Sequence, residues 1–194
     1  SSVSQIGYIM LGFGIGNYYG VTGAIFFILA HALAKGLLFL TAGSVVHVTG
    51  TRDLNKLAGL GERMPTTAWS FRFGGLSLVG IPPLVGFWAK FYIIIGIIKA
   101  GFIWVALVAI LLSVLTLAYL LKIENNVFMK KGQIDAKEAP FTMRIAMVFL
   151  VVLIVILGIG FQPIINFIVG PAAHALLRGL EYSHLVFNSF AANF

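Results

Sequence analysis

A long, mostly apolar run from residue 20 to residue 48 limits what this chain can fold into more than any other feature. A helix needs only about 20 apolar residues to cross the ~30 Å hydrocarbon core of a bilayer. Five further apolar segments occupy residues 3–16, 66–81, 84–98, 102–121 and 141–161. With 60% hydrophobic and 10% charged residues, the chain has more apolar surface than one small core can bury. The sequence therefore predicts an all-α integral membrane protein with about six transmembrane segments.

Two adjacent prolines interrupt regular helix between segments 66–81 and 84–98. Pro82 and Pro83 lack backbone N–H groups, and Gly86 adds flexibility. Irregular backbone at membrane depth persists only where protein or a water-filled cavity surrounds it. The pattern fits either a turn outside the membrane or a discontinuous helix beside an ion path.

The net charge of +7 belongs to the loops beside the spans. Such basic loops set orientation and contact anionic lipid, and no nucleic-acid-binding motif accompanies the charge. If the chain crosses the membrane three times between the basic loop 49–65 and the polar loop 122–140, the two loops lie on opposite sides. A re-entrant segment 84–98 would place both loops on one side.

The two ends of the chain differ in character. Residues 162–194 are expected to form an amphipathic tail, with His174, Arg178 and Glu181 on one helical face. The N-terminus lacks both an initiator Met and the features of a signal peptide. We therefore expect either a processed product or a fragment of a longer polypeptide. Near that end, Gly12, Gly16 and Gly20 have the spacing that permits close helix contact.

Away from their ends, the apolar segments contain no Asp or Glu and carry four basic side chains, namely His31, Lys35, Arg72 and Lys90. A charge at the centre of a membrane helix costs at least about 2.5–3.5 kcal/mol, which makes each a candidate functional residue. Lys35 and Lys90 lie at the middle of their segments, and His31 precedes Lys35 by one helical turn. Burial disfavours a protonated lysine and a nearby carboxylate favours it, so a lysine between these influences can load and release protons.

Arg72 does not deprotonate usefully. It is either a counter-ion, a gate or a water-binding group, or a structural residue satisfied inside the bundle. The acids are all expected in loops or the tail: Asp53, Glu62, Glu124, Asp135, Glu138 and Glu181. We therefore expect a buried Glu or Asp from a preceding segment or an adjacent subunit to approach the lysines. No metal site or cofactor site is expected, because cysteine and readable His/Asp clusters are absent from the sequence.

Four stretches occur in order, at residues 1–8 (SSVSQIGY), 31–45 (HALAKGLLFLTAGSV), 51–60 (TRDLNKLAGL) and 80–91 (GIPPLVGFWAKF). Together they resemble the antiporter-like membrane subunits of complex I, membrane-bound hydrogenases and Mrp-type antiporters. The resemblance implies an inverted-repeat fold, of which residues 1–121 match the second half-channel and residues 141–161 add a further transmembrane helix. It also implies that Lys35 is the central lysine, His31 its companion, and Lys90 the lysine of the discontinuous helix.

The function implied by this resemblance is proton or sodium translocation within a redox-driven respiratory complex, such as a membrane-bound hydrogenase or NADH dehydrogenase. The chain itself would bind no cofactor and hold no catalytic centre. Its partners would be other membrane subunits and the lipid bilayer, in the cell membrane of a prokaryote. Two alternatives stay open: an Mrp-type antiporter component without a redox partner, and a passive structural membrane subunit.

Overall fold

The computed structural model describes residues 1–132, 134 and 136–179, and every regular element in this part of the chain is helical. The expected all-α architecture is confirmed. The longer helices are α1 (Ser2–Ile15), α2 (Tyr18–Thr49), α4 (Pro65–Val79), α5 (Val85–Lys99), α6 (Ile103–Glu124) and α7 (Phe141–Ile159). The shorter ones are η1 (Leu54–Lys56), α3 (Leu60–Arg63), η2 (Asn125–Met129), α8 (Phe161–Ile164) and η3 (Ile165–Val169), followed by helical turns over 170–179.

Within the described part of the chain, three helices are long and apolar enough to cross a membrane: Tyr18–Thr49, Ile103–Met129 and Phe141–Ile159. By contrast, α4 and α5 contain 15 residues each. At about 1.5 Å per residue each spans only ~22 Å, which is less than a bilayer core.

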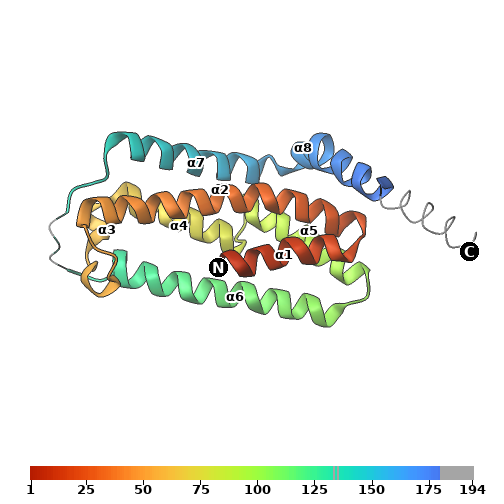
Figure 1. Cartoon of the computed structure of the whole chain (residues 1–194), viewed down its shortest axis with the longest axis horizontal. Coiled ribbons are helices and arrows are strands. Elements are labelled where there is room, and N and C mark those ends of the chain that lie inside the picture. The colour runs from red at the N-terminus through yellow and green to blue at the C-terminus, as the bar shows by residue number, and fades with distance from the viewer. Residues whose placement is uncertain (133, 135, 180–194) are drawn as a thin grey trace, which may run out of the picture.

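The two short helices α4 and α5 lie end to end along α2 (Figure 1). A Cβ added to Gly74 of α4 would touch Leu38 in the second half of α2, whereas one added to Gly23 in the first half would touch Ile93 of α5. Both helices therefore run in one direction and together extend along the length of α2. The expected count of about six transmembrane segments, including one discontinuous helix, is not confirmed, because apolar segments such as α4 and α5 are too short to span a bilayer singly.

The break between α4 and α5 is tightly packed. α4 ends at Gly80, whose φ of 93° lies in the left-handed region that glycine adopts without a steric penalty. Pro82 and Pro83 follow, joined by a cis peptide bond. A Cβ on Gly86 would collide with the Ser77 carbonyl. The first turn of α5 thus packs directly against the last turn of α4.

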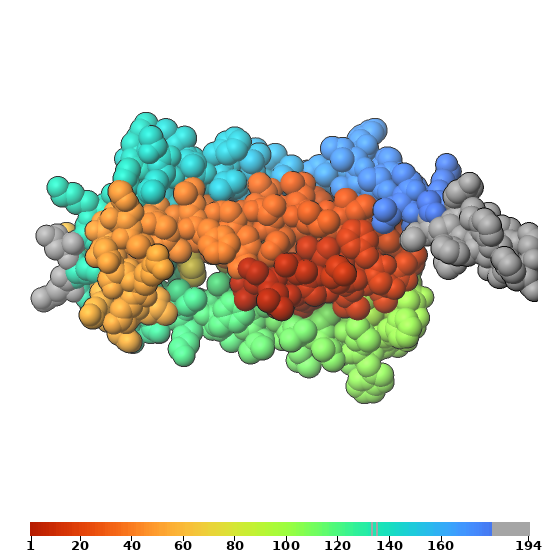
Figure 2. Space-filling view, in the orientation of Figure 1, coloured from red at the N-terminus to blue at the C-terminus, as the bar shows by residue number. Residues whose placement is uncertain are grey.

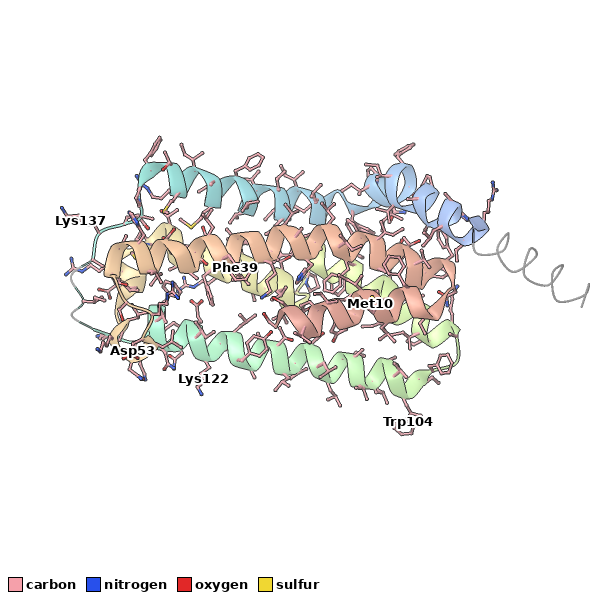
Figure 3. The ribbon with its side chains drawn as sticks, viewed as in Figure 1. Met10, Phe39, Asp53, Trp104, Lys122 and Lys137 are labelled. Atoms are coloured by element: carbon pink, nitrogen blue, oxygen red, sulfur yellow. The ribbon has the colours of Figure 1, made fainter. Side chains whose placement is uncertain are left out.

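Both basic loops lie at the same end of the bundle (Figure 1), and Figure 3 shows Asp53 and Lys137 together at that end. Between the two loops the chain runs along the bundle twice, once through the α4–α5 pair and once through α6. Glu138 links the loop before α7 to the start of α4, since its carboxylate accepts hydrogen bonds from Thr66 N at 2.7 Å and Thr67 Oγ1 at 2.8 Å.

Glycine permits close contact between α1 and α2, although not through a single face. Gly12 and Gly20 face each other, and a Cβ on either would lie 2.7 Å from the other residue's carbonyl oxygen. Gly16 instead ends α1 with a φ of 68°. The spacing expected to form one contact face therefore serves a helical hairpin, because the chain reverses at Gly16.

α6 extends beyond the boundary expected at residue 121. It reaches Glu124, and the π-helical turn η2 continues to Met129. Val127 and Phe128 are buried in the core, so apolar packing extends the helix into the segment expected to be a loop. Asp135, Glu181 and the part of the expected tail after residue 179 lie outside the described residues.

Candidate functional site

Lys90 lies beside the helix break and is only 3% exposed. Its Nζ donates to the carbonyl oxygens of Leu78 at 2.9 Å and Val79 at 3.2 Å, and to Ser113 Oγ at 3.2 Å. The first two acceptors are carbonyls of the last turn of α4. The ammonium group therefore occupies the C-terminal end of a helix, where the helix dipole favours a cation.

Aromatic faces complete the surroundings of Lys90. Nζ lies 4.5 Å from the centroid of the Tyr8 ring and 5.6 Å from that of Phe27. A desolvated cation over an aromatic face gains about 2 kcal/mol or more. These contacts and the α4 carbonyls favour the protonated lysine without a carboxylate.

The short helix α4 carries opposite charges at its two ends. Glu138 accepts hydrogen bonds at its N-terminus, and Lys90 donates to its C-terminal carbonyls. Each arrangement complements the helix dipole, by about 0.3–1 kcal/mol at exposed sites and up to ~2 kcal/mol when partly buried. Side chains thus satisfy some of the unpaired backbone groups at both ends of α4.

Tyr8 and Ser113 extend the polar site from α5 to α1 and α6. The Tyr8 hydroxyl lies 2.9 Å from Ser113 Oγ and donates to the Ala109 carbonyl. Sequence reasoning missed both residues because it considered only side chains that ionise near neutral pH. A hydroxyl within an otherwise apolar helix was the available signal.

Lys35 and His31 lie on α2, on the side that α1 partly covers. Lys35 is half-buried within this chain, and its Nζ donates to Ser1 Oγ at the start of α1. The Phe39 ring lies 5.4 Å from the same Nζ. His31 is half-buried with its ring 6.3 Å from that of Phe27, which also faces Lys90. On α2, His31 thus lies between Lys35 and Phe27, and Phe27 is the residue of α2 that faces Lys90.

Arg72 lies apart from both lysines. Its Nε donates to Glu124 Oε1, and its guanidinium carbon lies 4.7 Å from the Trp69 ring centroid. The Glu124 side chain is 9% exposed and the Arg72 side chain 31%. The expectation that Glu124 belongs to a loop was wrong, because α6 continues far enough to carry it beneath α4. This is the one salt bridge among residues 1–132, 134 and 136–179.

A hollow opens beside the start of α1, between α2 and α6 (Figure 2). It corresponds to a cavity of about 510 Å³ whose walls include Phe39, Thr41, Arg52 and Ile123. α1 has 14 residues and α2 has 32, so α1 leaves the second half of α2 uncovered on this side. The cavity is mainly apolar and does not include His31, Lys35 or Lys90.

Residues 1–116 match the family model described as NADH:quinone oxidoreductase/Mrp antiporter, TM. The chain belongs to this family. Together with the apolar helices, the match confirms a multi-pass membrane protein of the antiporter-like class. The prokaryotic relatives named below agree with a prokaryotic cell membrane.

Among curated relatives of this antiporter-like chain, subunit N of the NADH-quinone oxidoreductase of Desulforudis audaxviator is 40% identical over 131 residues, covering 67% of this chain and 26% of the relative. A Na⁺/H⁺ antiporter subunit of Alkalihalophilus pseudofirmus is 37% identical over 168 residues, covering 85% and 34%. In the Mrp complex from Dietzia, one chain superposes with a TM-score of 0.85 at 30% identity, covering 93% of this chain and 42% of that one. This chain therefore spans about a quarter to a third of the two curated relatives.

Proposed function

We propose that this chain forms an ion-translocating half-channel in a membrane subunit of a redox-driven complex such as a membrane-bound hydrogenase or NADH dehydrogenase. Protons, or sodium ions coupled to them, would move along a path that includes Lys35, His31 and Lys90. The observation that carries this proposal is Lys90, a lysine 3% exposed and held at a helix break by carbonyls and aromatic faces. Burying an ammonium group for packing alone is costly.

The chemistry of Lys90 suits reversible protonation. Its charged form is favoured by the α4 carbonyls and disfavoured by its removal from solvent, which are the two opposing influences that a group gaining and losing a proton requires. Pro82, Pro83 and Gly86 form the break that exposes these carbonyls, and we assign them this role. Lys35, which is more open, would exchange protons with whatever covers α2 in the assembly.

A carboxylate from outside the described residues is part of this proposal. Within those residues, Glu124 forms a salt bridge with Arg72, and Glu138 accepts hydrogen bonds at the start of α4. An acid about 4 Å from Lys35 would favour its charged form by about 4 kcal/mol at an effective dielectric of ~20. We propose that a preceding segment or a neighbouring membrane subunit supplies it, and that Arg72 serves as a counter-ion that holds α4 to α6.

A second candidate function is an Mrp-type cation/proton antiporter component without a redox partner. The likeness to the Na⁺/H⁺ antiporter subunit of Alkalihalophilus pseudofirmus and to the Mrp complex favours it, because these comparisons cover 85% and 93% of this chain. Both candidates use the same lysines and differ in what drives transport.

The experiment that separates the candidates is purification of the native complex from membranes, followed by transport assays in liposomes. Copurification with an iron–sulfur or hydrogenase module, and transport that requires its electron donor, supports the redox-driven complex. Transport driven by an imposed sodium gradient without such a module supports the antiporter. If neutralising Lys35 and Lys90 leaves transport intact in either setting, the chain is a passive structural subunit.

A further inference from the structure

Gln5 is a fully buried amide with no protein partner. Its exposed fraction is 0%, and neither Oε1 nor Nε2 forms a hydrogen bond within the described part of the chain. A buried amide without partners forgoes both its donor and its acceptor hydrogen bonds, so such a group usually contacts a ligand or a bound water. His31 Nδ1 on α2 is likewise buried and unpaired.

The register of α1 against α2 places these two residues at the same level of the helix pair. Lys35 contacts Ser1, Phe27 packs on Tyr8 with ring centroids 6.0 Å apart, and Gly12 faces Ala24. The helices are antiparallel, so each step forward along α1 matches a similar step back along α2. Gln5 lies midway between Ser1 and Tyr8, and residue 31 lies midway between Phe27 and Lys35.

This register produces a polar line along α1 within the apolar bundle. Ser1, Gln5 and Tyr8 occupy positions one turn apart on a single helical face. Ser1 contacts Lys35 at one end of the line, and Tyr8 lies under Lys90 at the other. Gln5 is the middle residue of this line and lies at the level of His31. The line therefore joins the two lysines through the α1–α2 interface.

We propose that Gln5 binds and orients a water molecule shared with His31 Nδ1, and that this water connects Lys90 with Lys35. The inference rests on the proposed transport function and adds Gln5 as a positioning residue. Gln5 Oε1 and Nε2 together with His31 Nδ1 offer three polar atoms, which is the usual number of partners for a buried water. An amide both donates and accepts, so it can hold the water in either orientation.

The proton balance is simple. One proton leaves the Lys90 ammonium, which becomes a neutral amine, and reaches His31 Nδ1 through the water. The imidazolium releases its Nε2 proton to the neutral amine of Lys35, one turn further along α2, which leaves the Nδ1–H tautomer of His31. Before the next transfer, the Nδ1 proton passes to water and Nε2 takes one up from water, which restores the first tautomer without a net change in protons. Gln5 neither gains nor loses a proton. It keeps the water within reach of Nδ1.

The test uses the intact complex with Gln5→Leu, which keeps similar volume and removes the amide. Transport should fall about tenfold, the effect of losing one well-placed hydrogen bond from the transfer path. Gln5→Glu should retain part of the activity, because it keeps a polar group of the same length. Thr22→Val is the matched control, since Thr22 Oγ1 is also buried and unpaired on α2 but lies beyond the line between the lysines. It should transport like the wild type.

A second readout is spectroscopic and starts from the wild-type complex. Proton-detected solid-state NMR of the wild-type complex with ¹⁵N-histidine should show a water contact at His31 Nδ1, assigned by its loss in His31→Gln. This contact should vanish in Gln5→Leu and persist in Thr22→Val. A wild-type complex without the contact, or normal transport by a well-assembled Gln5→Leu complex, overturns the inference. If Lys35→Met and Lys90→Met also transport normally, the transport function itself fails; if they abolish transport, only the role of Gln5 fails.

Discussion

Replacing Lys90 with Met should nearly abolish transport. Met reaches a similar depth but carries no proton, so the ion must pass this point of the bundle without a titrating group. Placing a charge at the membrane centre costs at least about 2.5–3.5 kcal/mol. At 1.36 kcal/mol for each tenfold change in rate, transport should fall roughly 100-fold.

Glutamate at the same position should give an intermediate rate. The acceptors around Nζ are the Leu78 and Val79 carbonyls at the end of α4. A protonated Glu can donate one hydrogen bond to them, whereas an ionised Glu is repelled by the helix terminus, by about 0.3–1 kcal/mol and up to ~2 kcal/mol when partly buried. Lys90→Glu should therefore transport faster than Lys90→Met and slower than the wild type.

The assay is ion uptake into inverted membrane vesicles that contain the whole assembly, followed with a pH-sensitive dye and normalised to the amount of this chain. Lys99→Met is the matched control, since Lys99 lies on the same helix and also faces an aromatic ring, that of Tyr19 at 3.9 Å, but is exposed. Its effect should stay within about twofold, as for most surface substitutions. If Lys90→Met transports as fast as Lys99→Met at equal protein levels, Lys90 is a structural residue. Equal loss with Met and Glu would indicate a lysine-specific contact instead of proton transfer.

Three further outcomes are expected. Lys35→Met should lower transport steeply while the chain still reaches the membrane, and unchanged pumping at normal protein levels would make Lys35 structural. Arg72→Met and Glu124→Gln should each destabilise the detergent-solubilised complex. A double-mutant cycle should give a coupling free energy of about 1–2 kcal/mol, because the pair is partly shielded from solvent. Additive losses of stability would contradict a stabilising ion pair. This chain has no native cysteine, so single cysteines can report the orientation. Lys137→Cys should react with an impermeant maleimide only from the cytoplasmic side, as expected for basic loops. Trp104→Cys, at the other end of the bundle in Figure 3, should react only from the opposite side. The reverse pattern would refute this orientation.

The character of the individual helices could be predicted from the sequence. Whether a segment is apolar enough for a bilayer is a local property of its composition, so the long runs that became α2, α6 and α7 were evident without tertiary information. The basic residues within the apolar segments were evident for the same reason. A local pattern also marked the break at Pro82 and Pro83, because missing N–H groups disrupt a helix wherever it lies.

Which groups meet was decided only by the tertiary structure. In a bilayer, a face covered by lipid and a face covered by protein are equally apolar, so hydropathy does not distinguish them. Arg72 therefore gave no sign that its partner was Glu124, 52 residues away in the sequence. Likewise, only the folded chain shows that α4 ends where the Lys90 ammonium can reach its carbonyls. In the sequence Gln5 is one polar residue within an apolar segment, and only the antiparallel register of α1 and α2 places it at the level of His31.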